Sequence, residues 1–286
     1  LQGIGRPVVG DFHRVKSDVV GIIQCADASA TVEGDLVSQG LLRTDTGTRS
    51  APFGARELTE NFVRIALYDE YTQAGERLVA APNPSRLRRW EGPVSIGIEF
   101  GETVPPAQRA KDLRDVRRFA SRLAIITGLD ISIGGADPNF HFLILNEDER
   151  LEYGPRVREL VPGISSQPVR TIVTMPRITR CLVIAFAGTS RTSSFTKAVS
   201  VIRGEHPDRL RLSCIHEEIA QGMGLANDSP AARPSIFNDD EEFGLLTKHD
   251  ELLLRILYDP RLDIGMNEEN ARPIVAQIAD DLVGGS

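Results

Sequence analysis

The segment 214–227 constrains the fold more than any other stretch, because it places apolar residues at helical spacing and stops them at a glycine. Ile215, Ile219 and Met223 recur every four residues, which predicts the buried face of a short helix. Gly224 follows at once, as expected of a left-handed residue that ends a helix. We therefore expect a helix with one buried face and one face that can carry chemistry.

The polar face of this helix carries Glu217, Glu218 and Gln221. Glu217 and Gln221 are four residues apart and project from the same side, whereas Glu218 is rotated by about 100° and should diverge from Glu217. Asn227 follows the glycine by three residues. Because neighbouring side chains on a helix diverge, we do not expect them to flank a glycosidic bond as a carboxylate pair does.

This spacing resembles the signature of metzincin zinc peptidases, His-Glu-x-x-His-x-x-Gly-x-x-His. Over 217–227 the chain reads Glu-Glu-x-x-Gln-x-x-Gly-x-x-Asn, so the catalytic glutamate and the glycine match and all three histidines are replaced. Residues 235–237 resemble the metzincin turn, with Phe237 at the methionine position, and 246–258 resembles the closing helix. The chain also resembles an uncharacterised family of exported bacterial proteins built around Glu-Glu-x-x-Gln and Gly-Leu-x-Asn-Asp.

The resemblance implies an exported, periplasmic or secreted metal-dependent peptidase that acts on a peptide or protein substrate. It implies Glu218 as the general base, and a metal held by side chains among Glu217, Gln221, Asn227, His216 and Asp228. Zinc is possible, and calcium or no metal are the alternatives, because amide oxygens are weak zinc ligands. The alternative function is a catalytically inactive protein of this fold that binds a peptide or glycan. We favour the register beginning at Glu217 over one beginning at His216, because there Ala220 offers no ligand atom and pairing His216 with Gln221 requires a π-bulge.

The periodicities predict an α+β fold, with a mixed twisted sheet against which a long helix over 107–127 and the motif helix pack, and the resemblance implies that this fold is of the zincin type. We expect an N-terminal region over 1–88, the metzincin-like domain over 89–262, and a C-terminal helix and tail over 263–286. A helix should begin near residue 55 and run to about 71. Thr247 should cap a further helix with Asp250, and His141 should face solvent. Strands are expected over 94–100, 131–133, 140–145, 171–175, 182–186 and 198–202.

The composition is that of a globular protein, with 286 residues, of which 41% are hydrophobic and 26% charged. The net charge of -7 and the lack of long basic runs argue against a nucleic-acid partner, and no apolar run is long enough for a membrane span. The first residue is not methionine, so we expect that a precursor segment has been removed. Cys181 and Cys214 are a candidate disulfide, with buried thiols as the alternative; Cys25 and His13 are expected to be structural.

Overall fold

The computed structural model describes residues 29–47, 50–74, 77–189, 192–238 and 240–284, over which the protein is an α+β fold. Cys25 and His13 therefore lie outside the described residues. Within these ranges the chain forms a helix over 29–38, then α2 (Ala55–Ala66) and a two-stranded antiparallel pair, β1 (Tyr68–Ala74) with β2 (Arg77–Pro84).

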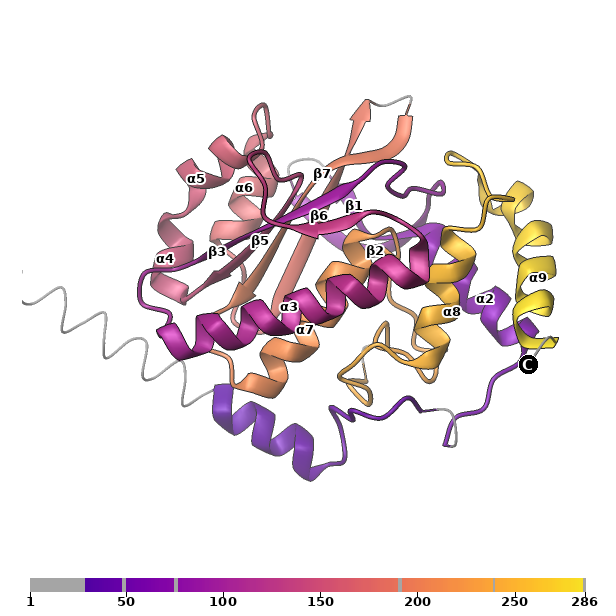
Figure 1. The fold of residues 1–286 in the computed structure, drawn as a ribbon, viewed down its shortest axis with the longest axis horizontal. Helices are drawn as coiled ribbons and strands as arrows, with labels where there is room; N and C mark the ends of the chain where they lie inside the picture. The colour runs from indigo at the N-terminus through magenta and orange to yellow at the C-terminus, as the bar shows by residue number, and fades with distance from the viewer. Residues whose placement is uncertain (1–28, 48–49, 75–76, 190–191, 239, 285–286) are drawn as a thin grey trace, which may run out of the picture.

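A five-stranded sheet is the centre of the described part of the chain (Figure 1). β3 pairs in parallel with β4 and β5, and β5 in parallel with β7, whereas β6 runs antiparallel to β7 and forms one edge of the sheet. In order across the sheet, the strands are β4 (Ile131–Ile133), β3 (Val94–Phe100), β5 (Phe140–Leu145), β7 (Thr192–Arg203) and β6 (Cys181–Thr189).

Helices cover both faces of this sheet. α3 (Pro106–Thr127) and α7 (Asp208–Gly222) lie across one face (Figure 1). The other face packs on α5 (Gly154–Leu160) and α6 (Ser166–Val173), which follow α4 (Glu147–Glu152). Because a strand covered on both faces has no solvent side, His141 in β5 is only 5% exposed, and its predicted position at the surface is wrong.

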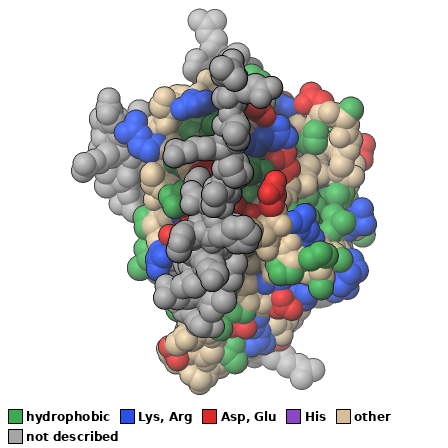
Figure 2. All heavy atoms as spheres, turned by 90° about the vertical axis from the view of Figure 1, so that its left-hand side faces the viewer, with side chains coloured by type: hydrophobic (Ala, Val, Ile, Leu, Met, Phe, Trp, Pro, Cys, Tyr) green, Lys and Arg blue, Asp and Glu red, His purple; other side chains and the backbone are tan. Residues whose placement is uncertain are grey.

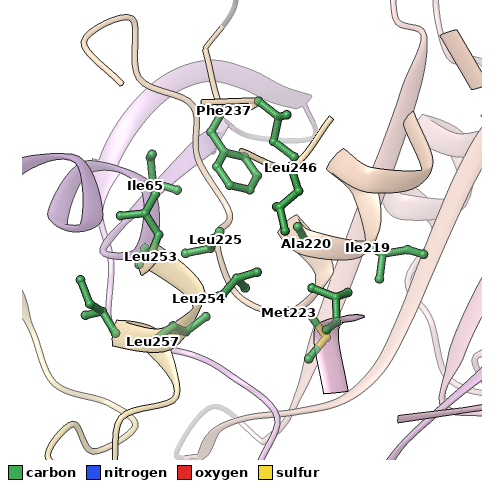
Figure 3. Close-up of a cluster of buried hydrophobic side chains, with 14 of the residues drawn as sticks. Ile65, Ile219, Ala220, Met223, Leu225, Phe237, Leu246, Leu253, Leu254 and Leu257 are labelled. Atoms are coloured by element: carbon green, nitrogen blue, oxygen red, sulfur yellow. The ribbon is translucent and has the colours of Figure 1, made fainter. Parts of the chain in front are cut away.

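The C-terminal half of α7 packs into a second group of helices, α2, α8 (Lys248–Leu257) and α9 (Glu268–Gly284). In the view of Figure 3, Met223, the residue after α7, lies between Ile219 of α7 and Leu254 of α8, and Ile65 of α2 lies beside Leu253. One apolar cluster runs from α2 through the sheet to α9, so it crosses the boundaries predicted near residues 88 and 262. Those boundaries themselves stay a prediction.

Two predicted elements are wrong. The strand expected over 171–175 is instead the end of α6 and the turn after it. The helix expected to reach residue 71 ends at Ala66, and residues 68–71, which were expected to be its last turn, belong to β1. By contrast, α3 ends at a left-handed Gly128, and Thr247 and Asp250 form the expected capping box of α8.

Candidate active site

The motif helix α7 is longer than its apolar periodicity indicates. It begins at Asp208 after an extended Pro207, and the carboxylate of Glu33 accepts a 2.9 Å hydrogen bond from the amide of Leu210 in its first turn. Such a carboxylate satisfies one of the amides that have no partner within the helix. Cys214 consequently lies in the middle of α7 rather than just before it.

At the other end of α7, side chains close the last turn. The indole nitrogen of Trp90 donates to the carbonyl of Gly222, and the hydroxyl of Tyr258 donates to the carbonyl of Met223, both at 2.9 Å. Gly224 then turns the chain with φ 126°, and a Cβ there would lie 2.3 Å from the carbonyl oxygen of Arg88. Only glycine fits this turn.

α7 is also fastened to the edge of the sheet. Cys181 at the start of β6 and Cys214 in α7 form a disulfide, as the sequence allowed. Gly222 lies so close to the sheet that a Cβ would be 2.5 Å from the ring of Phe140. Together these contacts fix the position of α7 against the sheet, through the disulfide at β6 and the close approach to Phe140 of β5.

A cleft of about 880 Å³ lies where α7, β6 and α6 meet. The first five residues of β6 line it in succession, so the edge of the sheet forms one wall. The carbonyls of Met175 and Pro176 in the adjoining loop accept hydrogen bonds from the buried guanidinium of Arg203, which fixes this rim. The polar side chains that line the cleft are Asp69, Arg88, Gln167, Arg170, Thr171, Thr174, Thr179, Glu217, Glu218, Gln221 and Asp228.

Glu217 and Glu218 converge at the wall of this cleft. A carboxylate oxygen of each and the sulfur of Cys181 all lie within 4.8 Å of one another, a grouping that could hold a metal ion. Glu218 is 2% exposed, whereas Glu217 is partly exposed. The expected divergence of the two carboxylates is therefore wrong, because two long side chains can bend back to one point although their Cα–Cβ bonds differ in direction.

The charges around this pair include cations as well as acids. Burial lowers the pKa of the Arg180 guanidinium, and the nearby carboxylate of Glu217 acts against that shift. Arg180 also forms an ion pair with Glu241, and Arg88 forms one with Asp69. The cleft thus holds both signs of charge.

Two other predicted ligands lie in the same cleft. The side-chain amide of Gln221 is 3.4 Å from Oδ1 of Asp228, and both residues line the wall that carries the two glutamates. Since the amide nitrogen of Gln221 faces Asp228, its carbonyl oxygen is the atom that can act as an acceptor or ligand.

His216 and Asn227 do not join them. The ring of His216 stacks on Phe119 with 4.0 Å between centroids, and its Nδ1 accepts a 3.1 Å hydrogen bond from the amide of Leu246. Burial lowers the pKa of His216 to about 3. Asn227 is 3% exposed and donates to the carbonyl of Arg64 in α2 at 2.8 Å. His216 therefore packs against α3, and Asn227 joins the segment after α7 to α2. No histidine is among the described residues that line the cleft.

Sequence reasoning missed the wall of the cleft formed by α6 and the loop after it. A signal for this helical region exists upstream, since Asn146 and Glu149 form a capping box at the start of α4. The pairing of Asp69 with Arg88 had no such signal, because it depends on the pairing of β1 with β2, which places Asp69 opposite Asn83 and so near Arg88.

On the face in Figure 2 the visible acidic and basic side chains are interspersed, which does not suit a polyanion. Within the described ranges, no helix combines the length and apolar character needed to cross a membrane.

Comparison with known proteins identifies a family for this chain. A search of the curated proteins finds no match. The model of the family described as "Protein of unknown function (DUF2927)" matches residues 55–277, which include the sheet, α7 and every residue that lines the cleft. Because this match covers most of the chain, the protein belongs to the DUF2927 family.

Proposed function

We propose that this protein is a divergent, metzincin-like hydrolase that cleaves peptide bonds in the cleft beside α7. The observation that carries the proposal is the convergence of Glu217 and Glu218 within 4.8 Å at the wall of a cleft of about 880 Å³. A buried carboxylate beside a partly exposed one supplies two different roles, a proton acceptor and a ligand or electrostatic partner. The retained spacing from Glu218 to Gly224 supports the same reading.

An extended peptide is the substrate that suits this cleft. β6 is one of the two edge strands of the sheet as described, and residues 181–185 line the cleft one after another. An edge strand has backbone groups without a strand partner on its outer side, so an extended peptide can pair with it. Such a peptide would run past the two glutamates on α7, as peptide hydrolysis requires.

The fit of a metal depends on the donor atoms. A three-histidine zinc site does not fit, because no described histidine lines the cleft and the sulfur of Cys181 is held in a disulfide. Oxygen atoms from Glu217, Glu218, Gln221 and Asp228 fit a hard cation such as calcium. When bound, a dication polarises a carbonyl and acidifies a water molecule.

Each side chain then has a defined task. Glu217 and the carbonyl oxygen of Gln221 would hold the cation, with Asp228 orienting the amide of Gln221. Glu218, at 2% exposure, would take the proton from the attacking water in a site shielded from bulk solvent. The disulfide favours an oxidising compartment, so we propose that the protein works outside the cytoplasm.

The alternative is a catalytically inactive protein that binds a peptide along β6 without cleaving it. The replacement of all three histidine ligands of the metzincin signature favours this alternative. The two functions differ in one measurable respect, since a binding protein would retain the peptide intact.

The test is cleavage of a quenched fluorescent peptide library by the oxidised protein with calcium, magnesium, manganese or zinc. Glu218→Gln should lower the turnover number by roughly 10²–10⁴-fold and still bind the cation, because it removes a proton acceptor and keeps its shape. Glu217→Gln should lose cation binding as well. Glu102→Gln, an exposed change of the same type, is the control. Intact peptide with every cation, together with peptide binding, would establish the alternative.

A further inference from the structure

The disulfide of this protein lies in its candidate metal site. Cys181 belongs both to the disulfide with Cys214 and to the group that includes the carboxylates of Glu217 and Glu218, all within 4.8 Å. A disulfide sulfur is a poor ligand, whereas a thiolate binds zinc strongly. The oxidation state of one bond therefore decides whether the site offers two carboxylates alone or two carboxylates and a thiolate.

We propose that reduction of the Cys181–Cys214 disulfide converts the cleft site into a zinc site formed by Cys181, Glu217 and Glu218. The inference deepens the proposed function, on which it rests for the role of Glu217 as a ligand. In the reduced protein Glu218 would serve as a zinc ligand instead of as the proton acceptor. A thiolate with two carboxylates is a three-residue set that leaves a position for water, as in catalytic zinc sites. The oxidised protein keeps only hard oxygen donors in the cleft.

The two sulfur atoms differ in access. Cys181 lines the cleft and is partly exposed, whereas Cys214 is 2% exposed within α7. A dithiol reductant that enters the cleft reaches Cys181 first, forms a mixed disulfide with it and releases Cys214 as a thiol. The second thiol of the reductant then displaces Cys181. The protein disulfide gains two electrons and two protons, and the reductant leaves as a disulfide; binding of Zn²⁺ then releases the Cys181 proton to solvent.

Redox state and metal binding must be coupled in both directions. If reduction tightens zinc binding, zinc must favour the reduced protein by the same factor. Residues 181–185 line the cleft that the proposed peptide occupies, so a change of ligand at Cys181 takes place beside the substrate. The reducing agent therefore acts on the same wall as the proposed chemistry.

The experiment compares two variants that both remove the disulfide and each keep one thiol. Cys214→Ala leaves Cys181 in the cleft, and Cys181→Ala leaves the buried Cys214 as its matched control. Zinc affinity is measured by competition with a chromophoric chelator, and Co²⁺ replaces zinc so that a thiolate–metal charge-transfer band can be recorded. Wild-type protein reduced with a dithiol gives the same measurement without any substitution, in case Cys214→Ala does not fold.

Cys214→Ala should bind zinc at least about tenfold more tightly than Cys181→Ala, since even an outer partner of a metal site contributes that much. The charge-transfer band should appear in Cys214→Ala and in reduced wild type, and be absent from oxidised wild type. Equal affinities and no band in Cys214→Ala and reduced wild type would overturn the inference. A band with no cleavage by the oxidised protein would instead overturn the proposed function alone, so the two failures are distinguishable.

Discussion

At the scale of single residues, Gly224 shows how one missing Cβ positions the cleft. Its φ is 126°, and a Cβ added to it would lie 2.3 Å from the carbonyl oxygen of Arg88. Both the backbone conformation and the lack of space therefore exclude alanine. Gly224→Ala should therefore lower the free energy of unfolding by about 3 kcal/mol, as measured by urea denaturation.

Gly128 is the matched control for this change. It also has positive φ, at 73°, but nothing lies within 4 Å of a Cβ built there. Gly128→Ala should lower the free energy of unfolding by about 1 kcal/mol, the cost of the left-handed conformation alone. Equal losses in the two variants would mean that the contact with Arg88 contributes nothing.

Residue patterns predicted part of the candidate site and misjudged the rest for a physical reason. Helical spacing identified Glu217, Glu218 and Gln221, and all three line the cleft. Spacing could not distinguish His216 from them, because its role depends on Phe119 and Leu246, which come from distant segments. The direction of a Cα–Cβ bond follows from the helix, but the end point of a glutamate side chain does not.

At the scale of elements, Asp250 fixes the loop between α7 and α8. Its carboxylate is fully buried and accepts hydrogen bonds from the hydroxyl of Ser235, the amide of Ile236 and both donors of Thr247. The sequence predicted the cap at Thr247, whereas the contacts with Ser235 and Ile236 required the folded loop. One carboxylate thus begins α8 and holds residues 235–237.

Asp250→Asn should lower the free energy of unfolding by roughly 3 kcal/mol. An amide nitrogen at the Oδ2 position would face the backbone N–H groups of Ile236 and Thr247, and at the Oδ1 position it would displace the hydrogen bond that Ser235 donates. In either case the remaining bonds lose their charge. Thermal unfolding followed by circular dichroism measures the loss. Asp280→Asn, an exposed change of the same kind in α9, should shift the midpoint very little. Similar shifts in both would contradict the role of Asp250.

Among the elements, long helices were easier to predict than short ones. α3 follows its apolar periodicity over several turns and ends at the expected glycine. α6 was mistaken for a strand because its end, around Ile172, is short and rich in β-branched residues, which suit either state. Packing favours the helix over the strand, because Val169 and Ile172 are buried against the face of the sheet that carries Val199 and Val201.

At the scale of the whole molecule, two histidines with lowered pKa values predict a loss of stability in mild acid. Burial, with help from nearby arginines, lowers the pKa of His206 to about 4 and that of His216 to about 3. Both are below the value of 6.5 for an unstructured histidine. The unfolded chain therefore binds more protons than the folded protein between these values, and stability rises with pH there.

The stability supplied by the two neutral rings is complete above pH 6.5 and is lost as the pH falls toward 4. Each histidine should contribute about 1.4 kcal/mol per pH unit to the slope within this window. Urea unfolding at pH 7, 6 and 5 measures how the free energy of unfolding changes with pH. His216→Gln and His206→Gln should each lower this slope by the contribution of about one proton. Comparing slopes removes the fixed cost of each substitution. An unchanged slope in both variants would mean that these rings bind protons equally in the folded and unfolded protein, and that the contacts of His216 with Phe119 and Leu246 do not lower its pKa.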